Sequence, residues 1–449
     1  MRIGFGKRKI TPWAGVPCSL GVDNELEQVF DDSWIRTMVL QHDDAMVIFM
    51  AADLIGFFWG EHADVARSVK LKCGLSDVQL VLHPTHTHLS PNVRWSGFAR
   101  VNAEGLNAVS REYYDYFLDQ AACSAVDALR DLEPCELFYG EAPVKNIQSC
   151  RRVPDGNGGI IMRYSRPSEE LRRLPEGHID PLARIVKFKR RGKDIVWINH
   201  NGHPTATGGD CAPFSTADYP GQAIRLLETQ LENCEFLYMT GPHGDLNPGK
   251  YVSDASGELT SRVRDRDAMG SRLAASVVDA MKNMSRLESK ELGFRRETLL
   301  LPRKEDYPTT LQAEVQYKDG IRRVLDAHAK GERMRGGGVV ERVIFNLVIL
   351  ENCVQDKVPA VVSSLKIGEL NVMFYPGEIF LKASDMLHQA FPGGPILAAS
   401  LCDGLFSYVP TPDVWDTGGY ELTATATGRQ AFDVIADTAL KQIRQMKNA

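Results

Sequence analysis

The sequence predicts an α/β fold of mixed α+β type, in which a large β-sheet core is flanked by helices. Strand-like and helix-like hydrophobic patterns alternate along most of the chain. No internal repeat at a fixed period and no low-complexity tract interrupts this alternation. Because sheets with an apolar face and helices with an apolar stripe bury each other in layers, we expect one large domain over residues 1–449.

The individual elements follow from the hydrophobic pattern in chain order. Strands are predicted at residues 34–41, 46–54, 78–85, 183–190, 194–202, 235–241, 370–377 and 395–401. Helices are predicted at residues 61–74, 111–132, 221–233 and 267–284, with a terminal helix from about Thr423. The stretches 153–177 and 329–343 interrupt this regular pattern without resembling Pro/Ser-rich linkers, and we expect them to be functional loops.

The composition is that of an ordinary globular protein. The net charge of −6 argues against a nucleic-acid partner, for which a basic face would be expected. The longest apolar run, residues 45–60, contains Asp53 and is shorter than the roughly 20 residues that span a bilayer, so no integral membrane association is predicted. Residues 1–13 show no export signal, and the nine scattered cysteines contain no CxxC pair. These features predict a cytoplasmic location with reduced thiols.

Three of the 11 histidines, His83, His86 and His88, lie within six residues of each other. In extended chain, His86 and His88 point to the same face, which suits two imidazoles that converge on a cation. Spacing alone makes these two histidines equal candidates. It also permits a structural interpretation, in which the histidines cap a strand or bond a loop.

Four further polar clusters follow predicted strands. Their members are His200 and His203, then His243, Asp245 and Asn247, then Glu378, and finally Tyr408 and Tyr420. Each cluster has a structural alternative, such as a turn-forming aspartate, a glutamate in a first helical turn or a core tyrosine. Together they supply the imidazole and carboxylate ligands of a zinc site with an open position, at the strand ends where α/β sheets place their sites.

The order of these motifs resembles the catalytic domain of the neutral/alkaline (non-lysosomal) ceramidase family, which are zinc-dependent amide hydrolases. The matching segments are RKITPWAGVPCSLG, THTHLSP, HPT…FSTADYPG, GDLNPG, YPGEIF and SYVPTPDVWDTGGYE. Because all six occur in the family's order, the resemblance runs nearly from end to end.

The resemblance implies one Zn²⁺ per chain, and it implies a role for each matching residue. The implied metal ligands are His86, His203, Glu378 and Tyr408. His88 and Tyr420 correspond to groups that orient the substrate carbonyl, and Arg151 or Arg152 corresponds to an arginine of the substrate pocket. Asp245, or a histidine, is expected to shuttle the proton to the leaving group.

Two departures from the family bear on the substrate. Asn247 stands where ceramidases carry a serine, so a hydroxyl nucleophile is missing, although the amide can donate a hydrogen bond to an oxyanion. The chain also shows neither an export signal nor the family's C-terminal β-sandwich. Its predicted loops are rich in arginine, which favours a small anionic or polyhydroxylated substrate over a lipid.

The sequence therefore predicts a zinc-dependent hydrolase in which metal-bound hydroxide attacks an amide carbonyl of a soluble polar substrate. One alternative is a metal-dependent ester or lactone hydrolase, or a hydrolase or lyase acting on an acidic sugar. Another is a non-catalytic metal-binding scaffold, and iron or manganese would tolerate the same ligands. The sequence contains neither a G-x-S-x-G elbow nor a G-x-G-x-x-G motif after a strand, which argues against serine-hydrolase and dinucleotide-binding functions. The oligomeric state stays open.

Overall fold

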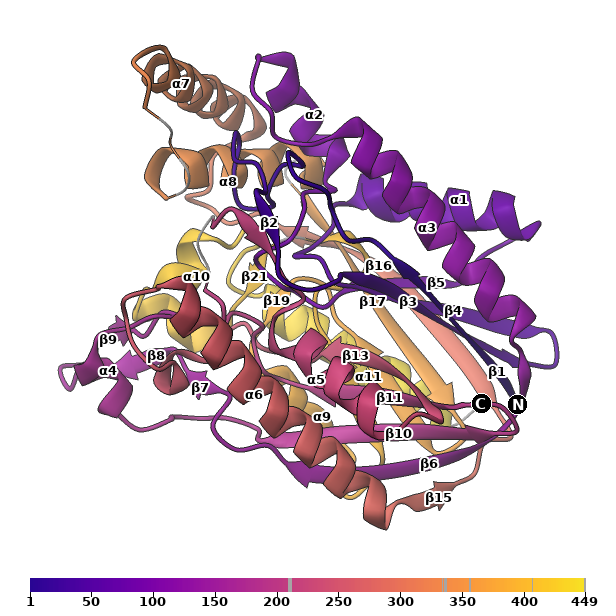
Figure 1. Ribbon diagram of the computed structural model, residues 1–449. Coiled ribbons are helices and arrows are strands. Elements are labelled where there is room, and N and C mark those ends of the chain that lie inside the picture. Colours follow the sequence, from indigo (N-terminus) through magenta and orange to yellow (C-terminus); the bar gives the residue numbers. More distant parts are fainter. Residues whose placement is uncertain (209–211, 333, 335–336, 355–356, 406, 448–449) are drawn as a thin grey trace.

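The computed structural model of the chain has two β-sheets packed face to face, with helices on the outer faces (Figure 1). It describes residues 1–449 except 209–211, 333, 335–336, 355–356, 406 and 448–449. This arrangement confirms the predicted mixed α+β class with a large sheet core flanked by helices.

The larger sheet has nine strands within the described residues. In spatial order its main path is β13 (Cys234–Thr240), β11 (Asp194–His200), β10 (Leu182–Arg190), β6 (Glu133–Pro143), β1 (Arg2–Lys9), β3 (Trp34–His42), β4 (Ala45–Ala52) and β5 (Leu80–Pro84), and β15 (Ser285–Leu287) pairs with β6. The pairs β4–β5 and β11–β13 are parallel, and the other pairs are antiparallel. Both ends of the main path are therefore parallel pairs.

The smaller sheet packs against the inner face of the larger one. Its order is β16 (Leu292–Pro302), β17 (Lys357–Ile367), β18 (Leu370–Phe374) and β20 (Ile396–Ala399), with β18 and β20 parallel. Phe49 of β4 lies between the sheets, with its ring centroid 5.0 Å from that of Trp197 and 5.6 Å from that of Phe374. Alternate residues of β11 explain this packing, since Trp197 faces the inner core and Val196 faces the helices.

Helices cover the outer faces of both sheets (Figure 1). The long helices are α1 (Trp59–Cys73), α2 (Trp95–Ala103), α3 (Arg111–Arg130), α5 (Asp218–Gln230), α6 (Leu259–Ala280), α7 (Thr310–Ala329), α8 (Gly338–Asn352), α9 (Lys382–Ala390) and α11 (Ala431–Lys447). Helix α3 lies directly on β1, because a Cβ on Gly4 would be 1.9 Å from the carbonyl oxygen of Ala128 and one on Gly6 would be 2.1 Å from that of Ser124. Glycine at these two positions is thus required for the close approach.

Short elements complete the chain and connect the site loops. Two-stranded pairs are β2 (Gln28–Val29) with β12 (Phe214–Ser215), β7 (Ser149–Cys150) with β14 (Leu246–Asn247), β8 (Arg152–Pro154) with β9 (Ile160–Met162), and β19 (Glu378–Ile379) with β21 (Tyr408–Val409). Short helices are α4 (Glu169–Arg173), α10 (Tyr420–Thr423) and the 3-10 turns η1 (Gly249–Tyr251), η2 (Met281–Asn283), η3 (Cys402–Gly404) and η4 (Pro412–Asp416).

Several predicted segments differ from the structure in extent or in kind. The terminal helix begins at Ala431 and not near Thr423, because Thr425 donates a hydrogen bond to the Tyr408 carbonyl and Thr427 forms a β-bridge with Arg303. The predicted loop 153–177 contains the β8–β9 pair and α4. The predicted loop 329–343 contains the start of α8, while residues 333, 335 and 336 lie outside the described part.

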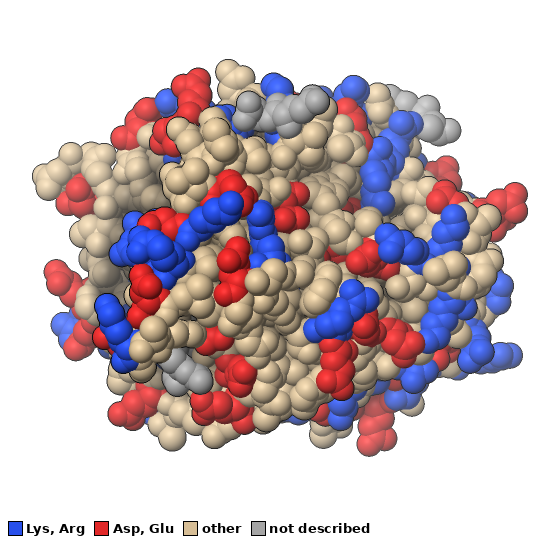
Figure 2. All heavy atoms as spheres, turned by 90° about the horizontal axis from the view of Figure 1, so that it is seen from above, with Lys and Arg blue, Asp and Glu red and all other residues tan. Residues whose placement is uncertain are grey.

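The distribution of charge on the surface and the polarity of the helices are those of an ordinary globular protein. Basic and acidic side chains are interspersed over the face seen in Figure 2. Among the helices of the described residues, none is both long and apolar enough to cross a membrane.

Candidate metal centre

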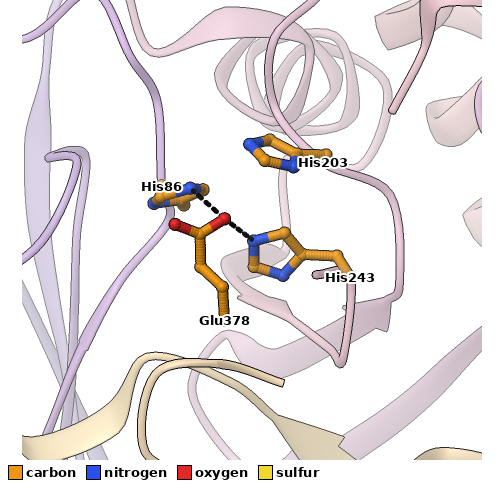
Figure 3. A group of neighbouring side chains, drawn as sticks. All are labelled: His86, His203, His243 and Glu378. Carbon is orange, nitrogen blue, oxygen red and sulfur yellow. Dashed lines mark ion pairs between the residues drawn. The ribbon is translucent and has the colours of Figure 1, made fainter. Parts of the chain in front are cut away.

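Four buried side chains converge beyond the carboxyl ends of the parallel strands: His86, His203, His243 and Glu378 (Figure 3). One ligand atom from each lies within 4.8 Å of the corresponding atom of every other. The histidines follow the ends of β5, β11 and β13 by two or three residues, and the glutamate follows β18. The parallel pairs thus deliver all four groups to one place, as expected for strand ends of α/β sheets.

His86 is held in a fixed orientation by its loop. Its ring Nδ1 lies 2.6 Å from the carbonyl oxygen of Ile55, and because a carbonyl only accepts, Nδ1 carries the proton and Nε2 offers its lone pair. The neighbouring hydroxyls anchor the loop, since Thr85 donates to Asp53 and Thr87 donates to the carbonyl of Thr216. The backbone of His86 has φ 68°, in the left-handed region that costs a non-glycine residue about 1 kcal/mol.

His203 and His243 are oriented in the same way. Nδ1 of His203 lies 3.2 Å from the carbonyl oxygen of Leu246, and Nδ1 of His243 lies 2.8 Å from that of Gly241. Each Nδ1 is therefore a donor, and each Nε2 is left with a lone pair. All three histidines thus present the same ring nitrogen to the centre.

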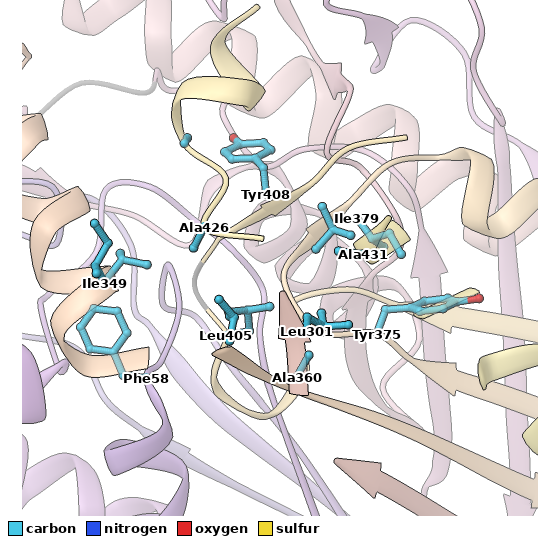
Figure 4. Close-up of a cluster of buried hydrophobic side chains, with 14 of the residues drawn as sticks. Phe58, Leu301, Ile349, Ala360, Tyr375, Ile379, Leu405, Tyr408, Ala426 and Ala431 are labelled. Carbon is cyan, nitrogen blue, oxygen red and sulfur yellow. The ribbon is translucent and has the colours of Figure 1, made fainter. Parts of the chain in front are cut away.

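Glu378 is placed by the two-residue strand β19 and not by the first turn of a helix, because α9 begins later, at Lys382. The neighbouring side chain of Ile379 is fixed in the hydrophobic cluster shown in Figure 4. The Glu378 Oε2 lies 3.5 Å from Nε2 of His86 and 3.9 Å from Nε2 of His243. Strand pairing also sets Glu378 directly beside Tyr408.

The electrostatics of the cluster suit a cation. Burial lowers the pKa of His243 to about 3 and that of His203 well below its usual range, so both imidazoles are neutral. Burial raises the pKa of Glu378, but the positive charge of the nearby Arg151 opposes this rise and favours the ionised carboxylate. Nε2 of His243 and Oε2 of Glu378 are buried without a hydrogen-bond partner. Converging lone pairs with one negative charge fit a divalent metal such as zinc.

Two predicted neighbours, His88 and Tyr420, lie beside this cluster. His88 is less buried than the four, and its Nε2 lies 3.3 Å from Nε2 of His86 and 3.1 Å from Nε2 of His203. The Tyr420 ring centroid lies 5.8 Å from that of Tyr408. Burial and the nearby Glu378 carboxylate raise the pKa of Tyr408, whereas Arg151 opposes this rise.

The two predicted arginines differ in their surroundings. The guanidinium of Arg151 lies 4.8 Å from the ring centroid of Tyr408 and 5.5 Å from that of Tyr420, which brings it beside the cluster. Arg152 instead donates to Thr417, to the carbonyl of Gly418 and to Glu421. Arg151 is thus the arginine beside the two site tyrosines.

Asp245 and Asn247 make hydrogen bonds that stabilise the fold around the cluster. The Asp245 carboxylate accepts the backbone N–H of Leu381, and burial raises the pKa of Asp245 to about 6. The Asn247 amide donates to the carbonyl of Arg163 and accepts the N–H of Gly249. Both ends of the Asn247 amide are therefore used within the protein.

His243 belongs to one of the polar clusters found in the sequence, but the resemblance to ceramidases implies no ligand role for it. The signal that favours His243 is its offset from the strand end, since His203 follows β11 and His243 follows β13 by the same number of residues.

Comparison with solved structures identifies the fold. The chain matches neutral ceramidase from Pseudomonas aeruginosa with a TM-score of 0.71 and 18% identity, over 98% of this chain and 73% of that one. A second match, a ceramidase complexed with C2, has a TM-score of 0.70 and 17% identity, over 99% of this chain and 75% of that one.

The chain has a neutral-ceramidase-like fold. This confirms, at the level of the fold, the ceramidase-like domain predicted from the six sequence segments. No protein-family model matches the sequence, and no curated protein matches it at a significant level. The likeness to ceramidases is thus carried by the three-dimensional arrangement at low sequence identity.

Proposed function

We propose that the protein is a zinc-dependent hydrolase that cleaves an amide bond in a soluble, polar substrate. The observation that supports this most directly is the convergence of four buried ligand groups, His86, His203, His243 and Glu378, on a neutral-ceramidase-like fold. Imidazole nitrogens and a carboxylate are the usual ligands of catalytic zinc.

The four residues of the cluster would hold the ion through Nε2 of each histidine and a carboxylate oxygen of Glu378. When bound there, zinc supplies Lewis acidity that polarises a carbonyl group and makes water more acidic. The hydrogen bonds from Nδ1 to the carbonyls of Ile55, Leu246 and Gly241 keep each imidazole in the binding tautomer.

The remaining residues would handle the substrate and the proton. His88 is the more accessible histidine at the edge of the cluster, and we assign it to take up a proton from the attacking water and to return that proton to the leaving amine. Arg151 and Tyr420 would bind and orient the substrate carbonyl. Because its carboxylate already accepts the N–H of Leu381, Asp245 is better suited to fixing the turn.

The polar substrate is supported by the charge around the cluster. Arg151 is only 5% exposed, and a buried guanidinium favours a partner with negative charge or several oxygens. A ceramide offers mainly hydrocarbon, whose binding requires a large apolar lining. We therefore assign the preferred substrate to soluble N-acyl compounds.

The test combines metal analysis of the purified protein with a substrate screen. Soluble N-acyl amides, esters, lactones and uronate glycosides are assayed beside short- and long-chain ceramides, with and without a chelator. We expect about one metal equivalent per chain and a chelator-sensitive activity on a soluble amide. Efficient turnover of long-chain ceramide with little activity on soluble compounds would overturn the substrate assignment, and a protein without metal would overturn the metallohydrolase itself.

A further inference from the structure

Glu421 is a fully buried carboxylate between the two arginines beside the candidate metal centre. Its relative exposure is 0%, so the substrate does not reach it. We propose that Glu421 is a positioning residue, which aims Arg151 at the metal centre and thereby selects substrates that carry or develop negative charge beside the scissile bond. This inference rests on the proposed function and deepens it by naming the substrate class.

Both oxygens of Glu421 are occupied by arginine. Oε1 accepts a hydrogen bond of 2.7 Å from Nε of Arg151, and Oε2 accepts one of 2.6 Å from Nη1 of Arg152. Charge-assisted bonds of this length are strong and directional. Because Arg151 is held through Nε, the plane of its guanidinium is fixed.

The fixed plane leaves one end of Arg151 available to a substrate. Its guanidinium lies over the rings of Tyr408 and Tyr420, and Arg151 keeps 5% of its surface exposed. A substrate oxygen that reaches this exposed edge accepts a charge-assisted hydrogen bond, which is stronger than a bond between neutral groups. The carboxylate or oxyanion of a substrate supplies such an oxygen.

Arg152 has a different part in the same arrangement. Its Nη2 donates hydrogen bonds to the Thr417 hydroxyl and to the Gly418 carbonyl, so Arg152 links the loop before α10 to Glu421. Gly419 makes this possible, because a Cβ there would lie 2.3 Å from Nη1 of Arg152 and its φ is +117°. Glycine at position 419 is thus explained by the close approach of the Arg152 guanidinium.

The test measures binding of two small probes to the metal-loaded protein. Acetate is the anionic probe and imidazole is the neutral probe, and both are titrated by calorimetry against wild type and Glu421→Gln. We expect the substitution to weaken acetate binding about tenfold, the loss of one charge-assisted bond, with less than about a twofold change for imidazole. Glu421→Asp, which keeps the charge, should recover part of the acetate affinity.

A matched control separates positioning from general destabilisation. Asp403 is another buried carboxylate, and its Oδ2 accepts a hydrogen bond of 2.6 Å from Nη2 of Arg296 in β16. Asp403→Asn should lower the melting temperature and leave acetate binding unchanged. If the Glu421→Gln protein keeps its metal and its activity, equal weakening of acetate and imidazole binding would overturn the positioning role. Unchanged binding of both probes would overturn it as well. A wild-type protein without metal would instead overturn the proposed function.

Discussion

Two pairs of histidines near the carboxyl ends of β5 and β11 differ in the hydrogen bonds of their ring nitrogens. The lower pair, His83 and His200, lies within these strands, and the upper pair, His86 and His203, follows three residues later. Nδ1 of His83 lies 3.0 Å from the carbonyl oxygen of Ser400, and its Nε2 accepts the N–H of Thr240. Nδ1 of His200 accepts the N–H of Gly202, and its Nε2 lies 3.4 Å from the amide nitrogen of Gln148.

In the upper pair, each histidine has only one ring nitrogen that bonds to the surrounding backbone. His86 and His203 donate Nδ1 to a carbonyl, and their Nε2 atoms face the other groups of the cluster. All four histidines are buried, so burial does not distinguish them. The group that the second ring nitrogen meets separates a candidate metal ligand from a structural histidine.

The largest expected effect comes from substituting the two histidines at the end of β11 separately. His203→Ala should remove about one metal equivalent and nearly all activity, because it deletes a ligand from a buried site. His200→Gln should keep the metal, since the lower histidine bonds only to protein groups. Metal content by elemental analysis and turnover of the preferred substrate are the measurements. Equal metal loss in both variants would show that the upper and lower histidines do not differ in metal binding.

A smaller effect sharpens the choice of the fourth ligand. The geometry favours His243, whereas the resemblance to ceramidases implies Tyr408. We expect His243→Ala, which deletes a ligand, to lower metal affinity by more than about a hundredfold, and Tyr408→Phe to lower it about 10- to 100-fold, the usual range for a lost second-sphere group. Competition with a chelating dye measures both affinities. The reverse order would favour the ligand set with Tyr408.

The smallest effect concerns the pH dependence of stability at the lower pair of histidines. Burial lowers the pKa of His83 to about 3 from its usual value of 6.5, so the folded protein resists protonation. The stability of the neutral form is present above pH 6.5 and is lost as the pH falls towards 3, because the unfolded chain binds the proton first. His83→Asn should be less stable than wild type at pH 7.

The difference in unfolding free energy between wild type and His83→Asn should then shrink by about 1.4 kcal/mol per pH unit below pH 6.5. Urea unfolding at several pH values measures this difference. His200 is also buried, with a pKa of about 4, but it is common to both proteins and cancels. Parallel stability curves would contradict the assignment of this shift to His83.

Much of the fold followed from the hydrophobic pattern. Strands such as β4 and β5 were predicted because both of their faces are buried, which makes them continuous apolar runs. Strand β16 was not predicted, because its outer residues are exposed and charged. Helix α7 was also not assigned, and its outer face exposes Leu311 and Val315, which weakens the amphipathic pattern.

The site was predictable in its residue types and less so in its geometry. The resemblance brought together His86, His203 and Glu378, which the structure places in one cluster. It did not bring in His243, because the direction of a side chain after a tight turn depends on tertiary packing. Glu421 was not singled out for a similar reason, since its importance comes from two arginines far away in the chain.

The pairing of β19 with β21 has a consequence for how the protein is made. Glu378 and Tyr408 lie late in the sequence, and they meet only when these two short strands dock. During synthesis the three histidines leave the ribosome long before the carboxylate does, and chains generally fold from the amino-terminal side first. A metal ion held by all four groups would therefore require the last third of the chain, and its binding would report the complete fold more directly than secondary structure does.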